Sequence, residues 1–203
     1  MAQSKANQKG ELMKATNKKP LYGVGINDAN YCVTKIATNG SRCPFYERWS
    51  YMIKRCYSAK YQEKQPSYKG CSVTDSWLTF SNFRAWMLLQ DWEGKHLDKD
   101  ILTQGNKIYS SAFCLFVTRE INILLTENKS NVGAYPTGVS FHTNNNKFIS
   151  QISLKGKRKN LGYFLTQKQA FEAYKTAKYE HIKEVALKQA EPLKSALLAH
   201  IIQ

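Results

Sequence analysis

This sequence lacks the features that are typical of membrane proteins, secreted proteins and proteins stabilised by disulfides or zinc. Its 203 residues contain no apolar run near the roughly 20 residues that a membrane-spanning helix needs. Residues 1–19 carry lysines but no apolar stretch, which predicts that they are not a secretory signal. The five cysteines form no C-x-x-C pair and are odd in number, which disfavours a disulfide framework and a cysteine-ligated zinc site. We therefore expect a cytoplasmic protein with reduced thiols.

Acidic residues are also scarce. Lys plus Arg number 30 against 15 for Asp plus Glu, so the net charge is +15. Residues 129–170 contain no Asp or Glu at all, although that window holds seven basic residues. This excess predicts a polyanionic partner, with nucleic acid preferred over an anionic membrane surface. Gly23-Val24-Gly25 lacks the third glycine of a dinucleotide-binding loop, and no helicase or kinase signature occurs.

The N-terminal half begins with a basic segment and continues with an amphipathic helix. Residues 1–20 are polar and lysine-rich, which predicts a flexible arm that either binds phosphates or is simply solvated. A helix is expected from Pro44, and a second one from near Ser81. The apolar face of the first helix comprises Phe45, Trp49, Met52, Ile53 and Cys56. Its outer side carries three candidate nucleic-acid contacts, Arg48, Lys54 and Arg55.

The chain changes character after residues 128–136, which are loop-forming and are the expected domain boundary. Strands are expected around residues 139–141, 148–154 and 161–164. Thr166 and Gln169 have the spacing of a capping box and open a long helix. A small module of three antiparallel strands packed on one helix is therefore predicted for residues 137–190, followed by a helical tail over 191–203. The fold class is α+β.

A sheet covered on one side by a helix exposes its other side. An acid-free basic face suits a nucleic-acid partner, because each phosphate contact releases counterions. The densest basic cluster is the hairpin tip, whose cations are Lys155, Lys157, Arg158 and Lys159. The alternative for this tip is a solvated, charged turn that protects a sheet edge from aggregation.

The C-terminal module carries a resemblance in Thr137-Gly138-Val139, Leu161-Gly162-Tyr163-Phe164 and Ala170-Phe171-Glu172-Ala173-Tyr174. Residues 137–187 resemble the sheet-plus-helix DNA-binding domain of plant ethylene-response-type transcription factors, which also occurs in phage homing endonucleases. In that family the sheet lies in the major groove of DNA. Carried over by position, the resemblance implies contacts from Lys147, Gln151, Ser153, Lys157, Arg158 and Lys159.

The N-terminal half carries a second resemblance. Its motifs are Trp49-x-x-Met52-x-x-Arg55-Cys56-Tyr57, Tyr68-Lys69-Gly70-Cys71, Leu97-Asp98-Lys99-Asp100-Ile101 and Gly105-Asn106-Lys107. They resemble phage and prophage proteins of the HNH endonuclease type, which implies an HNH-like domain over residues 21–127. Such a nuclease folds its site as a β-hairpin followed by a helix. A histidine acts there as general base beside one divalent ion, Mg²⁺ being the expected cofactor.

The HNH resemblance implies strands over Leu97–Ile101 and Tyr109–Val117 and a helix from Thr118. Asp98 and the helical Asn122 are then the candidate metal ligands, and the acidic surroundings add Asp100. The base position falls on Lys99, and a lysine with an ordinary pKa near 10.4 is protonated at neutral pH.

His96 is the candidate substitute base, because it lies two residues before Asp98 and faces the same side of a strand. A second departure from the family is Phe113, which stands where a structural asparagine precedes Cys114. Asp98 and Asp100 have a simpler interpretation as surface charges that balance Lys95 and Lys99.

Three functions remain open at this point. The first is a DNA-binding phage-type protein with a degenerate nuclease site. The second is an active Mg²⁺-dependent endonuclease or nickase that uses Asp98, His96 and Asn122. The third is a phage regulator that binds RNA or an acidic host protein. The composition favours the first two, and the lysine at the base position favours the first over the second.

Overall fold

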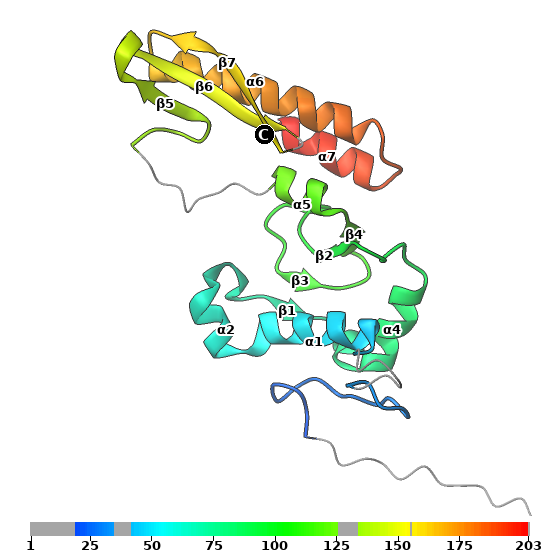
Figure 1. Cartoon of the computed structure of the whole chain (residues 1–203). Coiled ribbons are helices and arrows are strands. Elements are labelled where there is room, and N and C mark those ends of the chain that lie inside the picture. Colours follow the sequence, from blue (N-terminus) through cyan, green and yellow to red (C-terminus); the bar gives the residue numbers. More distant parts are fainter. Residues whose placement is uncertain (1–18, 35–41, 126–133, 155, 203) are drawn as a thin grey trace, which may run out of the picture. The chain divides into compact units, whose positions relative to one another are not determined.

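The computed structural model describes residues 19–34, 42–125, 134–154 and 156–202 (Figure 1). The chain forms two compact units, which we call unit 1 (Met1–Lys69 with Asp75–Ala85) and unit 2 (Gly70–Thr74 with Trp86–Gln203). Helices and strands are combined as the α+β class predicts. Residues 1–18 of the expected arm (1–20) lie outside the described residues. The expected boundary over 128–136 lies outside them up to residue 133.

Unit 1 is built around buried tryptophans. Its elements are α1 (Pro44–Tyr57), α2 (Ala59–Lys64), η2 (Pro66–Tyr68), α3 (Asp75–Leu78) and the start of α4 (Phe80–Leu88). Pro44 opens α1 as expected, since a proline at the first helical position loses no hydrogen bond. Trp49 is fully buried, and its indole N–H donates to the carbonyl of Trp77 at 2.7 Å. Phe80 packs on Trp49 with ring centroids 5.6 Å apart, so α1 is held against the α3–α4 segment.

The first part of unit 2 contains two short strand pairs and a helix. β1 (Ser72–Val73) runs parallel to β3 (Ile108–Tyr109), and β2 (His96–Asp98) runs antiparallel to β4 (Leu115–Val117). The helix α5 (Arg119–Leu125) follows, and the hydroxyl of Thr118 accepts the N–H of Ile121 at 3.4 Å. The expected hairpin strands, 97–101 and 109–117, were too long. β2 ends at Asp98, and Tyr109 belongs to the other strand pair.

The second part of unit 2 is the predicted sheet on a helix. β5 (Val139–His142), β6 (Lys147–Leu154) and β7 (Lys157–Phe164) form an antiparallel sheet in that order, and η3 (Thr143–Asn145) joins the first two strands. α6 (Gln167–Ala186) packs on all three strands, and both hydrogen bonds of the Thr166–Gln169 capping box are present. Within the described ranges, no helix is long and apolar enough to cross a membrane.

The end of α6 and the last helix, α7 (Leu193–Ile202), share an apolar core with the first part of unit 2. This shared core comprises Ile101, Val117, Ile121, Ile182, Val185, Ala186 and Leu197. Residues more than 80 positions apart in the sequence therefore belong to the same core, as Ile101 and Leu197 do. The sheet-plus-helix module and the β2–β4–α5 segment are parts of one folded body.

We predict that Leu197→Ala lowers the free energy of unfolding by about 2–5 kcal/mol, because it opens a cavity in the shared core. The matched control is Leu187→Ala, whose side chain is 60% exposed and which changes stability by no more than about 0.5 kcal/mol. Urea denaturation of the full chain measures both. Similar small effects for the two variants would contradict the shared core.

Candidate nucleic-acid interface and acidic loop

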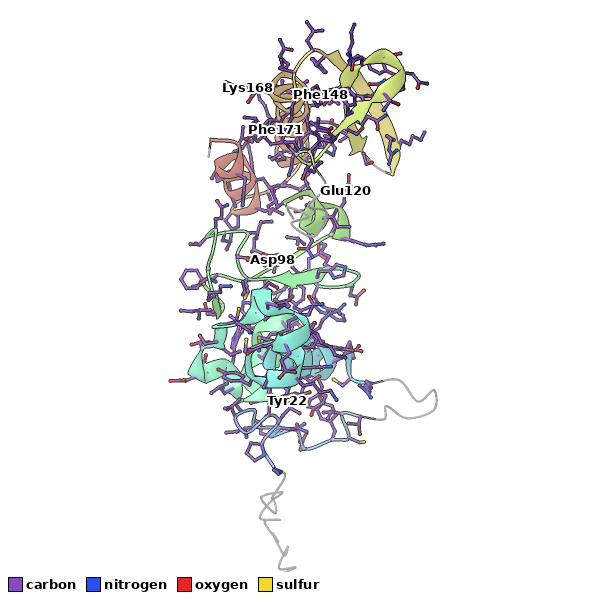
Figure 2. All side chains as sticks on the ribbon, turned by 90° about the vertical axis from the view of Figure 1, so that its left-hand side faces the viewer. Tyr22, Asp98, Glu120, Phe148, Lys168 and Phe171 are labelled. Atoms are coloured by element: carbon purple, nitrogen blue, oxygen red, sulfur yellow. The ribbon has the colours of Figure 1, made fainter. Side chains whose placement is uncertain are left out.

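The register of the three-stranded sheet decides which side chains share a face. Phe141, Phe148 and Phe164 stand opposite one another across the strands, and the rings of Phe141 and Phe148 meet at 5.2 Å (Figure 2 labels Phe148). Ser150 and Ile152 belong to the same face, and they are 0% and 6% exposed beneath α6. This inner face is the one that the helix covers.

The opposite side, which we call the outer sheet face, carries the candidate interface. His142 is paired with Lys147 there, and the rings of His142 and Tyr163 meet edge to face at 5.4 Å. Further along the sheet, Gln151 is paired with Asn160. The face comprises Ser140, His142, Lys147, Ile149, Gln151, Ser153, Arg158, Asn160 and Tyr163. Two cations and several amide or hydroxyl groups lie together on it without any carboxylate.

A β-bulge in β7 decides which cations reach this face. Ser150 is paired with Gly162, but the next residue, Gln151, is paired with Asn160, so Leu161 is the extra residue. The side-chain amide oxygen of Asn160 accepts the N–H of Gly162 at 2.9 Å and holds the bulge. Beyond the bulge the alternation is inverted, which places Arg158 on the outer sheet face.

The contact residues that the sequence predicts on the sheet are therefore divided between its two faces. Lys147, Gln151, Ser153 and Arg158 lie on the outer sheet face. Lys157 and Lys159 are paired with Leu154 and Ile152, so they belong to the inner face, and both are exposed. Lys155 lies outside the described residues.

Two further residues of this face, Asn160 and Tyr163, were not predicted as contacts from the sequence. The Nδ1 atom of His142 is buried and has no hydrogen-bond partner among the described residues. His142, at the end of the first strand, is a candidate phosphate contact on sequence grounds, and the structure places it on this face. No sequence signal marks Asn160, because its side follows from the bulge.

The other predicted basic residues lie on α1 in unit 1. Arg48 is half-buried. The ammonium of Lys54 lies over the ring of Tyr61, with Nζ 5.1 Å from the ring centroid, and the guanidinium of Arg55 lies 5.3 Å from the centroid of Tyr68. These contacts combine positive charge with aromatic surface at the end of α1.

Asp98, labelled in Figure 2, terminates β2 and shapes the loop that follows. Its Oδ1 atom accepts the backbone N–H of Asp100 at 3.0 Å and that of Ile101 at 2.8 Å. Burial raises the pKa of the Asp98 carboxyl, and the nearby charge of Asp100 raises it further. The carboxyl group thus acts as an acceptor that turns the chain.

Lys99, at the expected base position, is 6% exposed and serves as a hydrogen-bond donor. Its Nζ donates to Oδ2 of Asp100 at 3.1 Å and to the carbonyl of Asn106 at 2.8 Å, and it lies 6.0 Å from the ring centroid of Tyr109. The side chain of Asn106 in turn donates to the carbonyls of Lys99 and Ile108. The Lys99 side chain therefore ties the loop together as a hydrogen-bond donor.

The remaining candidates do not complete a metal site. His96 is exposed opposite Val117 at the start of β2, and Asn122 is half-buried on α5. The carboxylate of Asp100 is already engaged by the Lys99 ammonium, which competes with a divalent ion for the same oxygen. No group of three or more His, Cys, Asp or Glu side chains that could hold a metal occurs in the described part of the chain. The donor set around Asp98 does not fit Mg²⁺ as it stands.

The sequence-predicted residues that the structure describes thus lie in three regions: the three-stranded sheet, α1, and the segment from β2 to α5. The chain matches no protein-family model, no curated protein and no solved structure. The geometry of these three places is the basis for the function proposed below.

We predict that Asp98→Asn stabilises the fold at neutral pH. The amide keeps the oxygen that accepts two backbone N–H groups and removes the cost of a buried charge. The pKa of Asp98 is raised in the folded state. Its contribution to the free energy of unfolding is therefore fully present below the unfolded pKa of about 4, and it is lost as the pH rises through the folded pKa. Urea denaturation at about pH 3 and pH 7 is expected to show a gain for the variant only at the higher pH.

Asp98→Ala is the matched control. It leaves two backbone N–H groups without their acceptor, which costs about 1–3 kcal/mol at either pH. A native chain that is more stable than Asp98→Asn at neutral pH would show that the ionised carboxylate stabilises the loop.

Proposed function

We propose that this protein binds nucleic acid, with duplex DNA as the preferred form, through the outer sheet face. We further propose that its HNH-like part is a scaffold with a degenerate nuclease site. The observation that supports binding is the composition of that face: two cations, three polar side chains with amide or hydroxyl groups in the adjoining rows, and no carboxylate. These are Lys147, Arg158, Gln151, Ser153 and Asn160.

The dimensions of the sheet agree with a major-groove partner. Neighbouring strands lie about 4.8 Å apart, so three strands span about 10 Å, and the major groove of B-DNA is about 12 Å wide. Arginine makes bidentate hydrogen bonds to guanine, and glutamine or asparagine makes them to adenine. Arg158, Gln151 and Asn160 therefore suit base edges, while Lys147 suits a phosphate.

The charges around the face support the same partner. β7 is an edge strand, and it carries Lys157 and Lys159 beside Arg158. The 129–170 window contains no acid that would neutralise them. Cations at the edge of a sheet that enters a groove are suited to the flanking phosphates, which set the register of the protein on DNA.

The proposal of a degenerate nuclease site is supported by Lys99. A general base must accept a proton from water, and the Lys99 amine instead donates two hydrogen bonds in a buried position. His96 has the ring chemistry of a base but lies exposed at the start of β2.

We predict that the double variant Lys147→Ala with Arg158→Ala weakens duplex DNA binding and lowers its salt dependence. Each lost phosphate contact removes about 0.9 from the slope of log affinity against log salt, so the loss of the Lys147 contact lowers the slope by about 0.9. The control, Lys183→Ala near the end of α6 with Lys188→Ala just after it, makes the same change in net charge away from the sheet.

Fluorescence anisotropy with a duplex of about 20 base pairs between roughly 50 and 200 mM salt measures the affinity and the slope. Equal losses for the two double variants would mean that only net charge matters and would contradict the outer sheet face. An A-form RNA duplex has a major groove too narrow for the sheet, so tighter binding to RNA would contradict the preference for DNA.

We predict that the native chain does not nick supercoiled plasmid in Mg²⁺ or Mn²⁺ buffer, because the base position holds a hydrogen-bonded lysine. Gel electrophoresis of the plasmid measures this. Nicking that is lost in His96→Ala, an exposed position at which folding is preserved, would establish the active-endonuclease alternative instead.

A further inference from the structure

The corner between α1 and α2 in unit 1 carries a second basic surface that the outer sheet face does not involve. Residues 54–69 contain five lysines or arginines and a single acid, Glu63. The same segment contains three tyrosines, and a fourth, Tyr51, precedes it by one helical turn. Positive charge and aromatic rings are therefore interleaved along this corner.

One lysine lies between two of these tyrosines. The Nζ atom of Lys54 is 5.8 Å from the ring centroid of Tyr51 and 5.1 Å from that of Tyr61. Tyr51 is 45% exposed, and Tyr61 and Lys54 are half-buried. We call these three side chains the tyrosine–lysine platform. Lys60 and Lys64 of α2 are exposed on either side of Tyr61 in the sequence.

The backbone beneath the platform is held by side-chain hydrogen bonds. The amide Nε2 of Gln62 donates to the carbonyls of Arg55, Cys56 and Tyr68, which ties the end of α1, α2 and η2 together. The hydroxyl of Ser58 accepts the N–H of Tyr61 at 3.3 Å and caps α2. A surface that is already ordered loses little conformational freedom when a ligand binds.

We propose that the tyrosine–lysine platform binds unpaired bases of a nucleic-acid strand. Phenol rings stack with bases of any sequence, and a duplex hides the base faces that stacking needs. Lys54, Lys60 and Lys64 supply the charge that the strand's phosphates require. This surface extends the proposed function, because it gives the chain a second contact with nucleic acid on a different unit.

The test uses the full chain with Tyr51→Ala and Tyr61→Ala combined. The ligands are a labelled single strand of about 20 nucleotides and the matching duplex. Base stacking on one aromatic ring is worth at least about fivefold in affinity, so the variant is expected to bind the single strand at least fivefold more weakly and the duplex equally well. The control, Tyr51→Phe with Tyr61→Phe, keeps both rings and is expected to retain affinity.

A second variant guards against loss of folding at the half-buried Tyr61. Lys54→Gln keeps both rings and removes one cation, so its single-strand binding is expected to show a salt slope lower by about 0.7. Unchanged single-strand affinity in the double alanine variant together with an unchanged slope in Lys54→Gln overturns the proposal.

The two proposals fail separately. Loss of duplex binding only in Lys147→Ala with Arg158→Ala supports the sheet, and loss of single-strand binding only in the tyrosine variant supports the platform. If the tyrosine variant loses the same affinity for the single strand and for the duplex, with an unchanged melting temperature, the platform does not distinguish unpaired bases. That result overturns the inference.

Discussion

The shared apolar core of unit 2 is the constraint on which the rest of that unit depends. The first part of α6 covers the inner face of the sheet, where Tyr174 closes over Gly138, and its last turns place Ile182 and Val185 in the shared core. Ile101 of the same core gives its N–H to Asp98. One helix therefore covers the inner face of the sheet and also packs in the core that holds Ile101, at the end of the Asp98 turn.

Which face of the sheet carries each charged side chain depends on backbone geometry as well as on composition. Three consecutive cations on a regular strand place two side chains on one face and one on the other. The bulge at Leu161 determines which of the three cations share a face. It places Arg158 on the outer sheet face, and Lys157 and Lys159 on the inner face. Under the proposed function, Gln151 and Asn160 beside Arg158 offer directed hydrogen-bonding groups rather than a uniform electrostatic patch. Sequence readout needs such directed groups, because phosphate contacts carry no sequence information directly.

Lys99 shows how the loop after β2 is stabilised around a buried amine. Burying an ammonium is costly unless it is paired and hydrogen-bonded. The Asp100 carboxylate and the Asn106 carbonyl meet that requirement, and the Tyr109 ring lies close by. The Asp100 carboxylate that a metal ion would need as a ligand is therefore already bonded to Lys99. This arrangement supports the proposed scaffold role of this segment.

Local patterns in the sequence determined much of this protein. The apolar stripe after Pro44, the capping box at Thr166 and the alternation over 148–154 are properties of neighbouring residues, so they predicted α1, α6 and β6. The tertiary structure alone decided three other features: the end of β2 at Asp98, the face of Arg158 and the joining of Ile101 to Leu197. Each depends on pairing or packing between distant segments, and a shift of one residue in register moves a side chain to the opposite face without altering the local pattern.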